Sequence, residues 1–75
     1  KSNIDIYPNP TRNSFALSAD VTHAEIYSIT GQLIKTFSDV ISNQQLDITN
    51  LETGMYLIKI TDSNGISQSK KIIKE

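Results

Sequence analysis

This 75-residue sequence contains no cysteine and no tryptophan, and it has only three glycines and two prolines. Without cysteine, neither disulfide bonds nor zinc–thiolate sites can brace the chain, so burial and strand pairing must stabilise it. Its apolar runs are far shorter than the roughly 20 residues that a membrane-spanning helix needs. The formal net charge of −1 mixes both signs and gives no electrostatic footprint for nucleic acid or an anionic membrane. We therefore expect no nucleic-acid partner and no direct insertion into a membrane.

The length allows one domain with one hydrophobic core, covering residues 1–75. A hydrophobic fraction of 37% is low for a compact fold. The apolar residues alternate periodically, however, which argues against disorder. The sequence begins abruptly at Lys1-Ser2-Asn3 with no signal peptide in front. We interpret it as a single domain excised from a longer protein.

One stretch, Gly54–Thr61, organises the rest of the chain. β-Branched and aromatic residues alternate along it, as is typical of a pleated strand that is half buried. One parity is fully apolar, and the other parity is only half apolar. We therefore predict a central strand with Tyr56, Ile58 and Ile60 facing the core, and with Met55, Leu57, Lys59 and Thr61 on the outer face.

The residues before this strand predict two short strands and a hairpin. Prolines fix φ at about −65° and remove backbone donors, so the first strand ends at Pro8-Asn9-Pro10. In the hairpin, Thr30-Gly31 is the tight turn, and Gly31 supplies a positive φ. Apolar residues change parity near Tyr27, which indicates a β-bulge or a strongly twisted strand end. The expected segments are strands at 4–7 and 14–18, and a hairpin over 22–37 whose return strand places Leu33 and Phe37 on one face.

The remaining segments complete the expected sheet. A polar loop at 38–43 precedes a short strand at 45–48, and Leu51 fills the core from the next loop. The run Asp62-Ser63-Asn64-Gly65 is a strong hairpin signal, because Asn and Gly tolerate left-handed geometry. The last strand covers 66–74. Seven short strands at roughly ten-residue spacing predict an all-β fold, a small antiparallel immunoglobulin-like β-sandwich, with a five-stranded barrel as the alternative.

The sequence offers little catalytic chemistry. His23 is the only histidine, and its position beside Glu25 on one strand face is typical of a surface residue. No serine or threonine has an identifiable base partner. The run from Asp62 to Gly65 resembles the start of a calcium loop, but the later bidentate acid is missing, so a hairpin turn is favoured. We expect no catalytic residue, no metal site and no cofactor.

Four motifs in a fixed order carry a resemblance to a known family. They are Ile6-Tyr7-Pro8-Asn9-Pro10, the mid-chain run from Ile26 to Ile34 with Thr30-Gly31, the run from Leu51 to Ile60, and the basic, apolar tail. Together they resemble the C-terminal sorting domain of type IX secretion cargo in Bacteroidetes, the Por secretion system type A domain. The resemblance covers the chain from about Ile4 to Glu75.

The resemblance implies a secretion signal rather than a catalyst. Such domains lie at the C-terminus of secreted enzymes and adhesins, and direct the folded cargo from the periplasm through an outer-membrane translocon. The implied partners are the translocon, its shuttle proteins and a sortase-like surface protease that removes the domain, often with anchoring of the cargo at the cell surface; the domain itself is expected to be monomeric. The sorting-motif residues carried over to this sequence are Pro8, Asn9, Pro10, Gly31, Gly54, Tyr56, Lys71, Ile72, Ile73 and Lys74.

Each of these residues also has a plain structural explanation. Pro8-Asn9-Pro10 ends a strand, the two glycines meet backbone requirements, and Tyr56 is a core aromatic whose hydroxyl reaches the rim. Lysines of the tail are typical of edge strands that avoid unwanted pairing. For residues 72–75 we favour a functional role, as an accessible edge to which a partner adds a strand.

Two other classes of function remain open on the sequence alone. The first is a carbohydrate-binding or adhesive β-sandwich, although such modules usually present aromatic platforms and this chain has no tryptophan. The second is a small enzyme, which the missing catalytic groups make remote. Further domains after Glu75 in the parent protein would favour the accessory module, whereas a terminal position fits the sorting domain.

Overall fold

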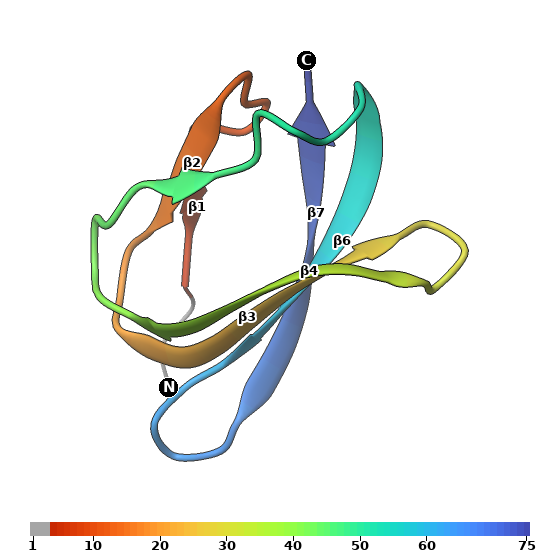
Figure 1. Ribbon diagram of the computed structural model, residues 1–75. Helices are drawn as coiled ribbons and strands as arrows, with labels where there is room; N and C mark the ends of the chain where they lie inside the picture. Colours follow the sequence, from red (N-terminus) through yellow and green to blue (C-terminus); the bar gives the residue numbers. More distant parts are fainter. Residues whose placement is uncertain (1–3) are drawn as a thin grey trace.

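The computed structural model describes residues 4–75, which form two antiparallel sheets (Figure 1). A three-stranded sheet has the order β1-β2-β5, and a four-stranded sheet has the order β4-β3-β6-β7. This arrangement confirms the predicted seven-stranded β-sandwich rather than the five-stranded barrel. The strands are β1 (Ile6–Tyr7), β2 (Ser14–Leu17), β3 (Val21–Ser28), β4 (Leu33–Val40), β5 (Leu46–Asp47), β6 (Gly54–Thr61) and β7 (Ser67–Lys74).

The hydrophobic core lies between the two sheets. Its largest member, Phe15 on β2, is fully buried, and its ring meets Phe37 of β4 edge-on at a centroid distance of 6.2 Å. Leu51 packs against the core from the loop before β6, as the sequence predicts. Burial of these side chains is the main stabilising term, since no disulfide is available. The buried cluster consists of Ile4, Phe15, Leu17, Val21, Ala24, Ile26, Val40, Leu46, Ile48, Ile58, Ile60 and Ile72.

Strand β6 is the central strand that the sequence predicts. It pairs with β3 on one side and with β7 on the other. Ile58 and Ile60 are completely buried, while Met55 and Leu57 on the opposite face are exposed. The predicted facing of this strand is therefore confirmed.

A register shift between Ile26 and Tyr27 interrupts the pairing of β3 with β4, at the place where the sequence predicts a bulge. Ile26 faces Lys35, but Tyr27 faces Leu33, so one extra residue is accommodated in β4. As a result Leu33 lies on the outer face with Tyr27, whereas Phe37 packs against the core. The prediction that Leu33 and Phe37 share one face is wrong, because the bulge inverts the parity of β4.

Strand β4 is also longer than predicted. The polar residues from Ser38 onward suggested a loop, but β4 continues to Val40, which pairs with Val21 and is buried. Pairing with β3 and burial of Val40 outweigh the low strand propensity of the polar residues before it.

Both predicted hairpin turns are present. Gly31 has φ 96°, and its N–H donates to the Ser28 carbonyl at 2.9 Å. In the second turn, the Asp62 carboxylate accepts hydrogen bonds from the N–H groups of Asn64 at 2.9 Å and Ile66 at 3.0 Å. Asp62 therefore organises a hairpin turn, which is the interpretation favoured over a calcium loop.

Candidate functional site

The Pro8-Asn9-Pro10 turn lies against the free edge of β7 at the C-terminal end of the sandwich (Figure 1). The Asn9 Nδ2 donates to the carbonyl of Lys71 at 2.9 Å, and the N–H of Ile73 donates to Asn9 Oδ1 at 3.1 Å. An Asn carboxamide carries both a donor and an acceptor, so it can replace the backbone of a neighbouring strand. The turn thus ends β1 and also covers part of β7.

Thr11 continues this cover towards the end of the chain. It forms an isolated parallel bridge with Lys74 and is 1% exposed. Its N–H donates to the carbonyl of Ile73 at 2.8 Å, and the N–H of Glu75 donates to the Thr11 carbonyl at 2.7 Å. Its hydroxyl donates to the carbonyl of Ser14. Segment 9–11, which follows β1 of the three-stranded sheet, is therefore hydrogen-bonded to β7 of the four-stranded sheet.

These contacts correct one expectation about the tail. The sequence suggested that the edge of residues 72–75 is accessible to a partner strand. In the structure, the hydrogen-bonding groups of Ile73 and Glu75 on that edge are satisfied by Asn9 and Thr11. Pairing with β6 occupies the other side of β7 along its length. An added strand would have to displace segment 9–11 first, because each edge group forms its ladder bond with one neighbour.

The side chains of the terminal strand alternate between the two faces of the sheet. Ile72 is buried in the core, and Lys74 is 8% exposed and stands directly opposite Gly54 on β6. Lys71 and Ile73 point outward and are exposed. The tail lysines therefore differ in role: the stem of Lys74 is buried, whereas Lys71 is on the surface.

Tyr56 is placed as the sequence predicts. It is half-buried against the core, opposite Ile72 of β7, and its hydroxyl donates to the carbonyl of Glu52 at 2.7 Å. The hydrogen bond fixes the loop that leads into Gly54, whose φ is 153°. This arrangement explains Tyr56 as a core aromatic with a satisfied polar end.

Most of the ten sorting-motif residues meet at one end of the sandwich. The turn at Pro8-Asn9-Pro10, the start of β6 at Gly54, and residues 71–74 of β7 are joined by the contacts above. Gly31 lies apart from them in the β3–β4 turn. It is connected to this end through Ser28, which accepts the hydrogen bond from the Gly31 N–H and pairs with Tyr56 of β6. Thr11, which the sequence analysis did not single out, is central to the arrangement; only its position directly after the second proline could have indicated it.

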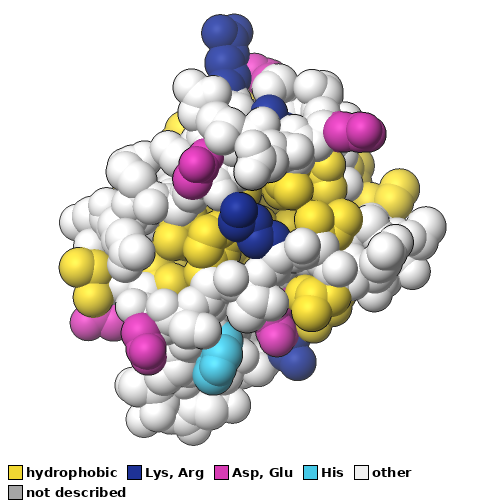
Figure 2. All heavy atoms as spheres, in the orientation of Figure 1, with side chains coloured by type: hydrophobic (Ala, Val, Ile, Leu, Met, Phe, Trp, Pro, Cys, Tyr) yellow, Lys and Arg dark blue, Asp and Glu magenta, His cyan; other side chains and the backbone are white. Residues whose placement is uncertain are grey.

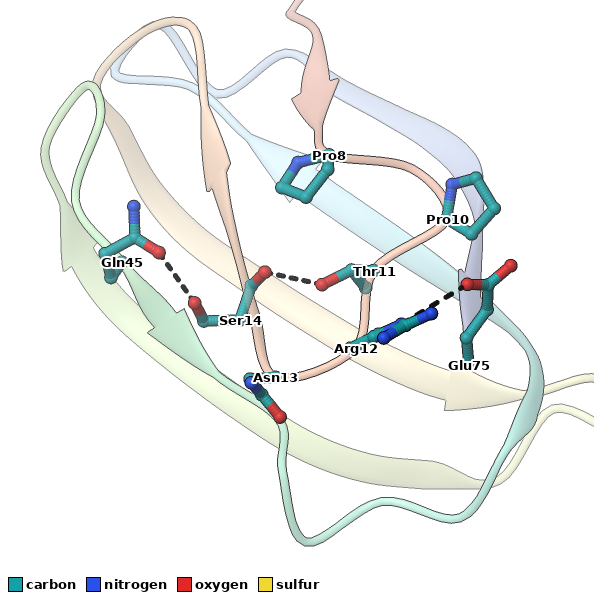
Figure 3. A pocket seen from close by; sticks show the side chains of 8 residues that line it. All are labelled: Pro8, Pro10, Thr11, Arg12, Asn13, Ser14, Gln45 and Glu75. Carbon is teal, nitrogen blue, oxygen red and sulfur yellow. Dashed lines mark hydrogen bonds and ion pairs between the residues drawn. The ribbon is translucent and has the colours of Figure 1, made fainter.

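A shallow, open pocket of about 420 Å³ lies beside the turn (Figure 3). Arg12 and Glu75 cross its rim as an exposed ion pair at 3.8 Å, and Ser14 Oγ donates to Gln45 Oε1 at 2.6 Å. Such an exposed pair contributes little stability. The hydroxyls of Thr11 and Ser14 in its walls donate to a backbone carbonyl and to an amide oxygen, so neither is hydrogen-bonded to a base. Its walls are formed by Pro8, Pro10, Thr11, Arg12, Asn13, Ser14, Gln45 and Glu75.

The described residues show no other arrangement suited to catalysis or metal binding. His23 is exposed, and its Nδ1 lies 3.3 Å from the hydroxyl oxygen of the adjacent Thr22. Within residues 4–75, no group of three acidic, histidine or cysteine side chains could hold a metal ion. The same residues include no helix with the length and apolar character of a membrane span.

Among residues 4–75, two titratable groups have a shifted pKa, and both shifts have local causes. The backbone N–H and then the hydroxyl of Thr49 donate to Asp47 Oδ1, at 2.9 and 2.7 Å, and lower the pKa of that carboxyl. Partial desolvation, followed by the hydrogen bond to the Glu25 carboxylate, raises the pKa of Tyr27. Neither shift prepares a proton donor or acceptor for chemistry near pH 7.

The molecule is thus a small β-sandwich module whose distinctive surface joins the Pro8-Asn9-Pro10 turn to the terminal strand. Residues 5–75 match the family described as the secretion system C-terminal sorting domain. The chain belongs to this family, and it is a C-terminal sorting domain of type IX secretion.

Curated relatives support the same assignment. An ulvan lyase of Nonlabens ulvanivorans is 34% identical over 96% of this chain, which corresponds to 14% of that protein. An endo-acting ulvan lyase of Formosa agariphila is 32% identical over 96% of the chain and 15% of its own length. A β-agarase of Zobellia galactanivorans is 30% identical over 93% of the chain and 14% of its own length. The chain therefore spans only a small part of the relatives that it matches.

Proposed function

We propose that this domain is the C-terminal unit of a larger secreted protein and carries that protein through the outer-membrane type IX translocon. The family match over residues 5–75 supports this proposal, as does the small share, 14–15%, that the matching segment makes up of the three relatives. The cargo precedes the domain, reaches the periplasm, is handed to the translocon with the help of shuttle proteins, and ends at the cell surface or in the medium.

One structural observation carries the proposal furthest, namely that motifs far apart in the sequence meet at one end of the sandwich. Asn9 and Ile73 are 64 residues apart, yet they are hydrogen-bonded, and Gly54 stands opposite Lys74. A surface built from such distant segments exists only when the domain is folded, so a partner that recognises it binds the folded state alone. The sorting-motif residues Pro8, Asn9, Pro10, Gly54 and residues 71–74 supply or support such a surface.

A sortase-like surface protease then removes the domain and, in the arrangement that the family suggests, joins the cargo to a surface anchor. We infer further that the cargo is an enzyme acting on a polysaccharide, because the three relatives are named as two ulvan lyases and a β-agarase. The domain itself contributes delivery, while any catalysis belongs to the cargo.

A reporter fusion tests the proposal. Residues 1–75 are fused to the C-terminus of an unrelated periplasmic reporter in a host that has the type IX translocon. We expect the reporter at the surface or in the medium, measured by fractionation and by protease accessibility on intact cells. Mass spectrometry of the exported reporter should show a C-terminus that lacks residues 1–75. In a host without the surface protease, the exported reporter should keep them.

Two control fusions make the result decisive. The reporter alone should stay in the periplasm, and the reporter fused to a verified sorting domain should be exported. If that second fusion is exported while the fusion with residues 1–75 stays in the periplasm, the proposal is wrong. The adhesive or carbohydrate-binding module then becomes the better interpretation.

A further inference from the structure

The outer face of the four-stranded sheet carries a group of exposed apolar side chains at one end. Leu33, Tyr27 and Leu57 form one row across β4, β3 and β6, because each is the direct cross-strand neighbour of the next. In an adjacent row, Met55 of β6 stands opposite Ile73 of β7. We call these five residues the outer apolar patch. Their aliphatic members are 38–50% exposed.

The other half of the same face is polar. Glu25 stands opposite Lys59, His23 stands opposite Thr61, and Ser69 of β7 continues the row of Lys59. Single exposed apolar residues are normal on any surface. A contiguous patch that spans all four strands of a 75-residue domain, next to a polar half of the same sheet, is typical of a surface that another molecule covers.

Lys71 extends the row of Leu57 onto β7 and lies beside Ile73. Among residues 4–75, the only ion pair is formed by Arg12 and Glu75, so Lys71 has no carboxylate partner in the described chain. A cation at the margin of an apolar patch favours a partner that brings a carboxylate, because the charge becomes partly desolvated when the patch is covered.

The two edges of the sheet are poorly suited to bind a partner strand beside this patch. On β7, Asn9 and Thr11 already occupy the edge next to Ile73. On β4, the bulge and the positive φ of 53° at Asp39 interrupt a regular edge.

Lys35 protects the β4 edge further, since it points toward the core side and its Nζ lies 5.6 Å from the Phe37 ring centroid. Figure 2 shows apolar side chains gathered along this side of the molecule, between β4 and the three-stranded sheet, with a cationic side chain among them. Inward-pointing charges and bulges are devices that prevent strand addition. A partner that contacts the side chains of the outer face does not need to add a strand to either edge of the sheet.

The patch also lies away from the end at which the cargo is attached. Ile4 is held beside Gln68, which pairs with Ile60, at the end of β6 and β7 opposite to Met55 and Ile73. Figure 1 likewise shows the beginning of β1 and the β6–β7 hairpin turn toward the end of the molecule that lies away from the C-terminus. In the proposed function the cargo precedes Ile4, so it leaves the outer apolar patch open.

We propose that the outer apolar patch, together with Lys71, is the docking surface for a protein of the secretion machinery whose own contact surface is apolar and carries a carboxylate that faces Lys71. This inference rests on the proposed sorting function. It adds which surface of the domain the partner binds and which chemical groups the partner brings. Burial of the four aliphatic side chains provides affinity, and the charge pair fixes orientation.

Paired variants in the reporter fusion test this surface. Leu57→Lys and Lys71→Glu change the docking surface, and Thr61→Lys on β6 and Ser69→Glu on β7 are matched controls in the polar half of the same face. We expect export to fall about tenfold or more for the two patch variants, since loss of one central contact reaches that size. The two controls should be exported like the wild-type fusion, and Lys71→Arg, which keeps the charge, should retain export.

Stability and self-association are measured on the isolated residues 1–75. Urea melts must show that Lys71→Glu remains folded under the assay conditions. If Leu57→Lys unfolds, the docking surface is tested by the export of Lys71→Glu alone. Export of folded patch variants at the level of the exported wild-type fusion contradicts the docking surface and leaves the sorting function intact. A wild-type fusion that stays in the periplasm contradicts the sorting function itself. If sedimentation shows a dimer that Leu57→Lys dissociates, a second copy covers the patch and the inference is wrong.

Discussion

Asn9 accepts a hydrogen bond from the backbone N–H of Ile73 at 3.1 Å, although the two residues are 64 positions apart in the sequence. The same carboxamide donates to the carbonyl of Lys71 at 2.9 Å, so one side chain bonds to two alternate residues on the edge of β7. Together with the Thr11 bonds, this contact makes the terminal strand dependent on the beginning of the domain. A chain that lacks either end therefore loses the surface at which the sorting motifs meet.

The first prediction concerns this contact. Asn9→Ala should lower the free energy of unfolding by about 1–2 kcal/mol, because two hydrogen bonds are lost at an exposed site. Asn9→Asp keeps the acceptor for Ile73 but loses the donor to Lys71, so its effect should be intermediate. Urea melts give the free energies, and amide hydrogen exchange should show faster exchange at Ile73 in Asn9→Ala. Asn13→Ala, in the same exposed loop, is the control; equal exchange at Ile73 in both variants would contradict the contact.

Much of the fold could be predicted because the period-2 pattern decides which residues are buried. Ile58 and Ile60 on β6, and Phe15 and Leu17 on β2, all enter the core as their parity indicates. The errors come from β4. One extra residue at the bulge inverts the facing of Leu33, and pairing with β3 extends the strand through residues whose own propensity is low. The sequence indicates a bulge near Tyr27, but it does not show that the extra residue lies in β4 or that β4 continues to Val40.

The second prediction tests the facing of the central strand. Ile58→Ala should cost about 2–5 kcal/mol, because it leaves a cavity in a fully buried position. Lys59→Ala, the next residue on the exposed outer face, should change stability by less than about 0.5 kcal/mol. Denaturant melts of the isolated 75-residue chain provide the comparison. A larger effect at Lys59 than at Ile58 would show that the strand is turned the other way.

The third prediction concerns the β3–β4 turn. Gly31 has φ 96°, and a Cβ at this position would meet no atom within 4 Å. Any cost of substitution therefore arises from backbone strain rather than from a clash. Gly31→Val should destabilise the domain by about 1–3 kcal/mol, and Gly31→Asn by less, since Asn tolerates positive φ. Gln32→Val is the neighbouring control. Thermal melts in which Gly31→Val and Gln32→Val are equal would remove the requirement for glycine.

The site was less predictable than the fold for a clear physical reason. Motif resemblance indicates Pro8-Asn9-Pro10 and residues 71–74 as separate segments, but no local pattern reveals that the Asn9 side chain bonds to the edge of β7. The role of Thr11 also depends on contact between segments more than 60 residues apart. Long-range hydrogen bonds of this kind form only when the two sheets are assembled, and the periodicity of the sequence does not predict them.

The fourth prediction concerns acid stability. The hydrogen bonds from Thr49 lower the pKa of Asp47 below its ordinary value in the folded state, so the unfolded state binds this proton more readily. The associated stability is fully present above about pH 4, near the ordinary pKa of an aspartate, and is lost as pH falls through the folded pKa. The urea midpoint should therefore drop less between about pH 6 and about pH 3 in Asp47→Asn than in the wild type. Thr49→Val keeps the backbone donor and should retain most of the drop; an unchanged drop in Asp47→Asn would contradict the assignment.

The last prediction separates folding of the domain from recognition of its tail. Deleting residues 72–75 removes the buried Ile72, the stem of Lys74 and the backbone bonds to Thr11. We therefore expect the deletion to unfold the sorting domain, to leave the fused cargo folded and to retain it in the periplasm. Glu75→Ala breaks only the exposed ion pair with Arg12 and should cost at most about 1 kcal/mol and leave export intact.

The measurements are limited proteolysis of the fusion, enzymatic activity of the reporter and fractionation of intact cells. A deleted domain that resists protease as well as the wild type, while its cargo stays in the periplasm, would show that the tail is read directly and is not required for folding. Export of the deletion variant at the wild-type level would show that residues 72–75 carry neither the fold nor the signal. The buried position of Ile72, its pairing with Tyr56 and the bond from Thr11 to Ile73 argue that both are lost together.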